Sequence, residues 1–268
     1  MKSGIINADL KGKVALITGA SQGLGAYYAE VLAKNGASVV LGGRSMEKLN
    51  KVVQRIADRG GDAHPLILEM TDFKSFDRKI EEITQKLSSI DILINNAAVS
   101  VDKEIFAITP SDWDFHMETN LKGLFFLSQS VAKKMKTQKN GGAIINIAAL
   151  NGDHVRKNCI SFSASKAGVI HLTKVMAYEL IDYKIRVNAL SIGLFASESV
   201  SEWLQNNPKA AQDYLEQIPA RRAGELVDLE GPILLLASDA SSYMYGAILK
   251  VDGGFSIDVF MHTEILHS

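Results

Sequence analysis

A glycine-rich turn after the first apolar run of the chain could hold a phosphate group. The run Val14–Thr18 leads into the sequence Gly-Ala-Ser-Gln-Gly-Leu-Gly, and a helical pattern follows. Glycines allow the backbone to turn tightly and to approach a pyrophosphate, and the helix N-terminus then faces the negative charge. An ordinary strand–helix turn is the alternative, but the first such junction is the position that a nucleotide site requires. The turn predicts that a cofactor contacts Gly19, Ser21, Gln22, Gly23, Leu24 and Gly25.

The end of the second apolar run indicates which nucleotide binds. An acidic residue there would hold the free ribose hydroxyls of NAD, whereas an arginine accommodates the 2′-phosphate of NADP. The chain reads Leu-Gly-Gly-Arg-Ser over residues 41–45, with no acidic residue before Glu47. This favours NADP(H), bound by Gly43, Arg44 and Ser45. The alternative is that Arg44 is a solvated residue at the start of the next helix.

Short apolar runs alternate with longer stretches of helical period along the chain, and these elements must position the turn. Uninterrupted apolar runs are typical of strands buried on both faces. They are Val14–Thr18, Ser38–Leu41, Pro65–Leu68, Ile90–Asn95, Ala143–Ala148, Ile185–Ser191 and Ala247–Val251. The predicted helices are Leu24–Asn35, Met46–Arg59, Phe73–Leu87, Ser111–Thr137, Ser163–Ile181 and Leu226–Ser238. The alternation predicts an α/β fold, doubly wound, with a mostly parallel sheet and helices on both faces.

Composition narrows the classes of function. The 268 residues are 47% hydrophobic and 22% charged, with a net charge of −1, so no basic surface argues for nucleic acid or an anionic membrane. No apolar stretch approaches the length of a membrane span. The only cysteine, Cys159, fits a reducing compartment, and we expect a cytoplasmic protein. With no linker or repeat, residues 1–268 are predicted to form one domain, in which about 195–219 are an insertion.

Further motifs follow in order and identify a family. Asn-Asn-Ala-Ala stands at 95–98, Phe-Ser-Ala-Ser-Lys at 162–166, Asn-Ala-Leu-Ser-Ile-Gly at 188–193 and Val-Asp-Gly-Gly at 251–254. With the glycine turn, these resemble the classical short-chain dehydrogenase/reductase family from Leu10 to Phe255. The resemblance implies a Rossmann-type sheet of seven strands, a nicotinamide cofactor, and a small carbonyl or alcohol substrate. It also implies a homotetramer, or a homodimer, formed through the helices at 111–137 and 163–181.

The family's catalytic group is a serine, a tyrosine and a lysine supported by an asparagine, and it matches only in part. Lys166 matches the lysine and Asn120 the asparagine. The tyrosine should stand four residues before the lysine, where this chain has Phe162, and the serine position is Ala149. Both catalytic hydroxyls are therefore absent.

The resemblance assigns roles to further residues. Glu69 and Met70 would flank adenine, Asn96, Ala97 and Ala98 would line its ribose, and Ile192 and Gly193 would lie beside the nicotinamide, whose ribose Lys166 would hold. The insertion would form a substrate lid, although its apolar residues could equally pack on the lid's own base. No metal ligands are assigned. The substrate-binding residues would be Asn151, Phe195, Trp203 and Leu204.

The missing hydroxyls have a chemical consequence. A carbonyl that accepts hydride develops negative charge on oxygen, which must be stabilised and protonated, and neither phenylalanine nor alanine can do so. Severe impairment is expected, with His154 as the one candidate substitute donor. The two replacements keep most of the side-chain shape. This is expected of a reductase that was engineered to trap a bound substrate. A natural pseudoenzyme acting as a nucleotide-binding or structural subunit is the alternative.

Overall fold

Seven strands form one parallel sheet in the computed structural model, which describes residues 8–138 and 140–257. The strand order is β3-β2-β1-β4-β5-β6-β7, and every neighbouring pair is parallel. The doubly wound α/β prediction is confirmed, and the sheet is fully rather than mostly parallel. The strands are β1 (Val14–Thr18), β2 (Ser38–Gly43), β3 (Asp62–Ile67), β4 (Ile92–Asn95), β5 (Gly142–Ala149), β6 (Ile185–Ile192) and β7 (Ile248–Val251).

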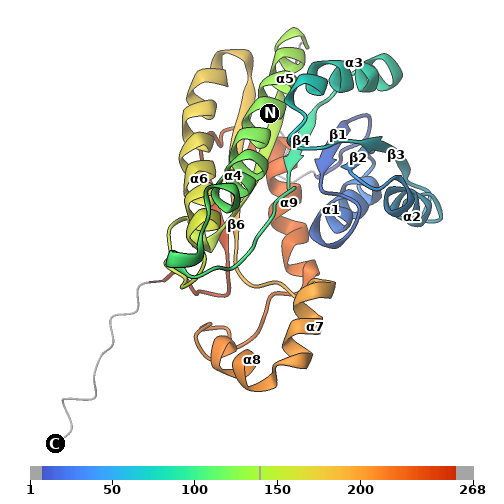
Figure 1. The fold of residues 1–268 in the computed structure, drawn as a ribbon. Coiled ribbons are helices and arrows are strands. Elements are labelled where there is room, and N and C mark those ends of the chain that lie inside the picture. Colours follow the sequence, from blue (N-terminus) through green and yellow to red (C-terminus); the bar gives the residue numbers. More distant parts are fainter. Residues whose placement is uncertain (1–7, 139, 258–268) are drawn as a thin grey trace, which may run out of the picture.

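Helices cover both faces of the sheet, because the central strands are apolar on both sides. One face packs on α1 (Gly23–Lys34), α2 (Met46–Ala57) and α9 (Glu230–Ala237), and the other on α3 (Phe76–Leu87), α5 (Leu124–Thr137) and α6 (Ile160–Leu180), as Figure 1 shows. The strand order reverses between β1 and β4, so their diverging connections leave a crevice at the carboxyl edge of the sheet.

The helix predicted over Ser111–Thr137 is interrupted. The structure has α4 (Pro110–His116), a π-helical segment (Met117–Gly123) and then α5. Short π segments are frequent at functional sites, because the wider turn redirects a side chain. Here the segment contains Asn120, whose amide binds the backbone of Val99.

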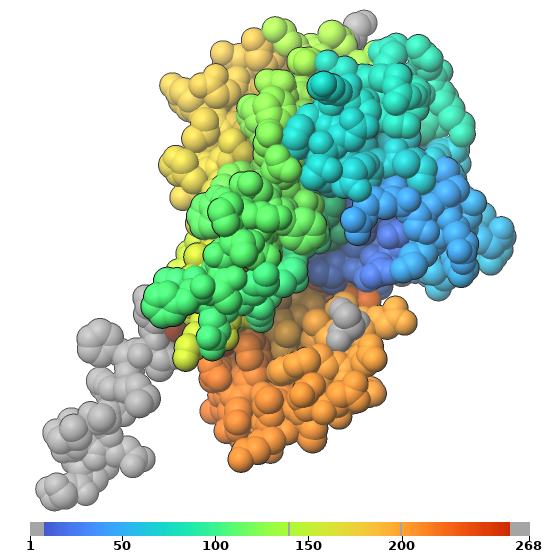
Figure 2. All heavy atoms as spheres, viewed as in Figure 1, coloured from blue at the N-terminus to red at the C-terminus, as the bar shows by residue number. Residues whose placement is uncertain are grey.

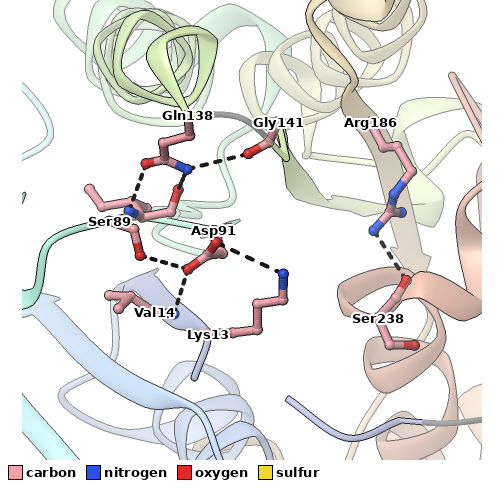
Figure 3. Close-up of polar contacts among 9 residues, drawn as sticks. Lys13, Val14, Ser89, Asp91, Gln138, Gly141, Arg186 and Ser238 are labelled. Atoms are coloured by element: carbon pink, nitrogen blue, oxygen red, sulfur yellow. Dashed lines mark hydrogen bonds and ion pairs between the residues drawn. The ribbon is translucent and has the colours of Figure 1, made fainter. Parts of the chain in front are cut away.

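Polar side chains fasten the opposite, amino edge of the sheet (Figure 3). The Asp91 carboxylate accepts hydrogen bonds from the Val14 amide at 2.9 Å and from the Ser89 hydroxyl at 2.8 Å, and Lys13 lies 4.0 Å away. Arg186, buried at the start of β6, donates to the carbonyl of Ser238 at 3.2 Å. These contacts join β1, β4 and β6 to neighbouring elements at the amino edge of the sheet. The candidate site lies at the opposite, carboxyl edge.

The predicted insertion at about 195–219 carries two helices, α7 (Glu198–Asn206) and α8 (Pro208–Leu215). Figure 2 shows them in orange as a lobe that projects from the body of the molecule below the carboxyl edge. Within the described residues, no helix is both long enough and apolar enough to cross a bilayer.

Candidate active site

The glycine turn between β1 and α1 is closely packed. Gly19 has a φ of +65°, a conformation that side chains disfavour. A Cβ on Gly25 would lie 2.4 Å from the Gly19 carbonyl oxygen and 2.6 Å from Nδ2 of Asn96. Thr18 Oγ1 accepts hydrogen bonds from the amides of Asn96 (3.0 Å) and Ala97 (2.9 Å), which fixes the β4 end against the turn. The turn therefore exposes backbone at the start of α1, as a phosphate site requires.

A cavity of about 520 Å³ opens beside this turn, along the carboxyl ends of β1 to β4. It is lined both by predicted cofactor residues and by residues that were not predicted, among them Lys48, Thr71 and Thr119. Gly23, Leu24, Gly25, Lys166, Ile192 and Gly193 do not line it. The predicted cofactor residues that the cavity brings together are Gly19, Ser21, Gln22, Gly43, Arg44, Ser45, Glu69, Met70, Asn96, Ala97 and Ala98.

Two cationic side chains stand at the β2 end of this cavity. Arg44 has a 73% exposed side chain and lies 3.9 Å from a carboxylate oxygen of Glu69. Lys48 Nζ donates to Oε1 of Gln22 at 3.1 Å, and the Lys48 amide donates to Oγ of Ser45, which caps α2. Both cations can reach an anion held between the glycine turn and α2, because they belong to the first turn of α2 and the residues that precede it.

Lys166 lies behind Phe162 on α6. Its side chain is 4% exposed, and its Nζ donates to the Ile147 carbonyl at 2.7 Å. The Nζ atom is 5.7 Å from the centroid of the Phe162 ring. Burial lowers the pKa of Lys166 to about 8. The ammonium therefore stands next to the one ring on this helix face, and that ring offers no hydroxyl.

Asn120 fixes the segment that follows β4. Its Oδ1 accepts from the Val99 amide at 2.8 Å, and its Nδ2 donates to the Val99 carbonyl at 2.9 Å. The same Nδ2 donates to Oγ of Ser165 at 3.1 Å, and that hydroxyl donates to the Phe162 carbonyl at 2.7 Å. Asn120 is thus linked through one serine to the first turn of α6, from which Phe162 and Lys166 project.

Ala149 is the last residue of β5, and the loop that follows it leads to α6. In this loop Asn151 Nδ2 donates to Cys159 Sγ at 3.7 Å. His154, the predicted substitute donor, has Nδ1 3.1 Å from Asp153 and its ring centroid 6.4 Å from that of Phe255. These contacts hold its imidazole against Asp153 and Phe255 rather than against Phe162, so its substitute role stays a prediction without support.

The predicted substrate residues of the insertion differ in accessibility. Phe195 is buried in the core, where its ring contacts Gly224 so closely that a Cβ there would lie 2.5 Å from it. Trp203 on α7 is 41% exposed, and Leu204 is half-buried. Phe195 therefore forms the base of the lid, and a substrate could meet Trp203 more readily. At the end of β6, Gly193 packs against Asp252.

Known proteins are similar to this chain over most of its length. A family model described as enoyl-(acyl carrier protein) reductase matches residues 19–256. The 3-oxoacyl-[acyl-carrier-protein] reductase FabG of Thermotoga maritima is 38% identical over 248 residues, which cover 92% of this chain and 99% of that protein. The 2-dehydro-3-deoxy-D-gluconate 5-dehydrogenase of Dickeya dadantii is 34% identical, covering 92% and 96%. This chain belongs to the classical short-chain dehydrogenase/reductase family.

Members of the short-chain dehydrogenase/reductase family with solved structures share the fold closely. A gluconate 5-dehydrogenase from Burkholderia cenocepacia, in complex with NADP and tartrate, superposes with a TM-score of 0.89 at 34% identity, covering 94% of this chain and 98% of that one. The family is one of oxidoreductases, and its solved members include NADP complexes.

Besides several other residues that line the cavity, sequence reasoning missed Lys48, Ser165 and His116. Lys48 follows Arg44 by four residues, about one helical turn, and its positive charge was the signal that could have identified it. Ser165 joins Asn120 to α6, and its place beside Lys166 in the motif was a signal. His116 is buried and contacts Phe162, with ring centroids 6.5 Å apart, but only its spacing of four residues from Asn120 hinted at this. The described residues contain no group of three potential metal ligands.

Proposed function

We propose that this protein is an NADP(H)-binding reductase scaffold for ketones, 3-oxoacyl compounds or secondary alcohols, and that its turnover is strongly impaired. The observation that carries the proposal is the pairing of an intact nucleotide cavity with Phe162 beside Lys166. Eleven of the predicted cofactor residues line this cavity, which supports nucleotide binding, while the ring next to the lysine has no group that donates a proton.

The donor set fits NADP(H). Gly19, Ser21 and Gln22 of the glycine turn line the cavity where a pyrophosphate would lie, and Arg44 and Lys48 supply two cations for a 2′-phosphate. No acidic residue precedes Glu47 at the β2 end, where NAD-binding sites place one. Lys166 would hold the nicotinamide ribose. When bound, the cofactor supplies or accepts the hydride.

The impairment follows from the two apolar side chains. Loss of one hydrogen-bond donor to a developing oxyanion costs about 10²–10³ in rate. Loss of a general acid costs about 10²–10⁴. These factors do not multiply, because groups that act as a unit are non-additive. We therefore expect turnover at least about 10³ below that of a variant carrying both hydroxyls.

Cofactor binding is tested by titrating NADPH and NADH against the protein and following nicotinamide fluorescence. We expect saturable NADPH binding, with NADH at least tenfold weaker, since about 1.4 kcal/mol from one charge-assisted contact gives a factor of 10. Absence of NADPH binding, or a preference for NADH, would contradict the cofactor assignment.

Catalysis is tested by restoring both hydroxyls. The Ala149→Ser/Phe162→Tyr variant should gain NADPH-dependent turnover of ethyl acetoacetate, a 3-oxoester, by at least about 10³ over the unaltered chain. Each single variant serves as a control and should recover far less. If NADPH binds and the double variant stays inactive on a broad carbonyl panel, the protein is better explained as a non-catalytic nucleotide-binding or structural subunit.

We further propose a homotetramer or homodimer, in the cytoplasm, assembled through α4–α5 and α6. Support comes from apolar side chains that these helices expose, including Phe126, Val175 and the 81% exposed Tyr178. Light scattering coupled to size exclusion should give two or four times the 29.1 kDa chain mass. A monomer at micromolar concentration would contradict this assembly.

A further inference from the structure

His116 is the last residue of α4, four positions before Asn120, and it is only 1% exposed. The sequence gives it no role, and neither the nucleotide cavity nor the proposed hydride chemistry uses it. Residues four apart lie on neighbouring turns of one helix face. The two polar side chains therefore point in the same direction, toward the segment after β4.

Both nitrogens of the imidazole are occupied, and their partners fix its state. Nδ1 lies 2.8 Å from the Asp112 carbonyl oxygen, which can only accept, so Nδ1 carries the proton. Nε2 then presents its lone pair, and it accepts from the Val101 amide at 3.0 Å. His116 is thus held as the neutral Nδ1–H tautomer. A second ring proton would place a donor against the Val101 N–H.

Val99 and Val101 are consequently held by two side chains of one helix face. Asn120 binds both backbone groups of Val99, and His116 binds the amide of Val101. The segment is also fastened from the other side, because the Lys103 amide donates to the Asn158 carbonyl at 2.9 Å. It therefore lies between the π segment and the β5–α6 loop, along the predicted substrate side of the cleft.

The imidazole also seats the Phe162 ring. The two rings meet edge to face, with centroids 6.5 Å apart and planes at 77°. Lys166 is the charged group in contact with this same ring, at 5.7 Å. His116 therefore contacts both the Val101 amide and the Phe162 ring.

We propose that His116 is a positioning residue that fixes the substrate-side wall at Val101 and the orientation of the side chain at position 162. The proposal rests on the proposed function, since it concerns the same cleft. It assigns His116 to the carbonyl substrate rather than to the nucleotide, because the nucleotide cavity is lined by Val99 but not by Val101 or His116.

The charged groups on the surrounding elements do not replace these bonds. Lys103 pairs with Asp112 at 2.6 Å, and Arg156 of the β5–α6 loop pairs with Asp102. Lys166 of α6 stands against the Phe162 ring. No charged side chain among the described residues bonds to the imidazole, whose two hydrogen bonds are both to backbone groups.

The test compares His116→Leu with His116→Gln, each in the unaltered chain and in the Ala149→Ser/Phe162→Tyr background. Glutamine can both accept and donate, whereas leucine keeps only bulk. In the restored background, we expect leucine to raise KM for ethyl acetoacetate about tenfold, as for a lost buried hydrogen bond. NADPH affinity should stay within about twofold, since a few tenths of a kcal/mol is typical of distant sites. Glutamine should restore KM.

Recovery of KM by glutamine, with NADPH affinity unchanged throughout, is the readout that a purely structural role would not give. A parallel loss of NADPH and substrate affinity in the leucine variant, or an unchanged KM, would overturn the proposal. So would a raised KM that persists with glutamine.

Hydrogen–deuterium exchange separates this inference from the proposed function. In the unaltered chain, His116→Leu should speed exchange in a peptide covering residues 99–103, and His116→Gln should not. If the restored variant has no turnover but the exchange rates change as expected, the reductase assignment is wrong, while the inference that His116 holds Val101 is supported. If exchange over residues 99–103 is the same in the unaltered chain and in both His116 variants, the inference that His116 holds Val101 is wrong.

Discussion

Replacing Lys166 by methionine should stabilise the protein at neutral pH. The Lys166 ammonium is buried and has one hydrogen bond, to the Ile147 carbonyl. Burial lowers its pKa from 10.5 to about 8, so the folded state holds the charged form poorly. Methionine has a similar length and no charge to desolvate.

The size of the effect follows from the linkage between proton binding and folding. With a folded pKa near 8 and an unfolded pKa of 10.5, the unfolded chain is favoured by about 3 kcal/mol at pH 7. At pH 10 this penalty falls to about 1 kcal/mol, because Lys166 is then neutral in the folded state and the pH lies just below the unfolded pKa of 10.5. The stability contributed at this site therefore rises with pH between about 8 and 10.5.

The assay is urea unfolding of the unaltered chain and of Lys166→Met, at pH 7 and at pH 10. Subtracting one protein from the other removes the contributions of other groups, including Tyr28, whose raised pKa acts in the opposite sense at alkaline pH. Lys157→Met, at an exposed loop position, is the matched control and should change stability by less than about 0.5 kcal/mol at both values.

The expected result is that methionine adds about 1–3 kcal/mol at pH 7, after the lost hydrogen bond is allowed for, and that its advantage shrinks by about 2 kcal/mol at pH 10. NADPH affinity should fall in the same variant. A methionine variant that is less stable at pH 7, or whose advantage does not depend on pH, would refute the reasoning, since the ammonium would then carry no burial penalty.

Three further changes concern the nucleotide cavity and are read out by NADPH titration. Gly25→Ala should abolish binding at micromolar protein, because its Cβ would lie 2.4 Å from the Gly19 carbonyl oxygen and displace the turn. Arg44→Ala should weaken NADPH about tenfold and leave NADH unchanged, since only NADPH carries the 2′-phosphate; equal losses would refute the specificity argument. Glu69→Gln should tighten NADPH a few-fold at low salt, because Arg44 loses the carboxylate 3.9 Å away; no change would show that this exposed pair is screened.

Most strands of the sheet could be predicted closely from the sequence because their information is local, whereas β3 begins at Asp62, three residues before the predicted run Pro65–Leu68. The run Val14–Thr18 coincides with β1, and Ile185–Ser191 falls one residue short of β6. Glycine turns and apolar runs are properties of a few consecutive residues. The same holds for the nucleotide cavity, most of whose predicted residues lie together because parallel strands bring their carboxyl ends to one edge.

The interrupted helix at 110–137 could not be predicted in this way. Its apolar pattern continues through Met117–Gly123, and the wider π turn is associated with Asn120 binding the backbone of Val99, a contact across 21 residues. His116 was missed for the same reason, since Val101 and Phe162 come from two other elements. Sequence spacing carries little information on such contacts, because a lone histidine on a helix has no characteristic pattern.

The energetics of Lys166 bear on what the chain retains. The lowered pKa of Lys166 corresponds to a cost of about 3 kcal/mol at neutral pH for holding a buried ammonium beside Phe162, and the hydrogen bond to Ile147 offsets part of this cost. In a reductase that uses tyrosine, the lysine serves both proton transfer and the nicotinamide ribose. Here the first use has no hydroxyl to act through, while a ribose could still accept hydrogen bonds from Nζ. A ligand that accepts hydrogen bonds from Nζ would offset more of this cost, which supports the proposed nucleotide binding rather than proton transfer.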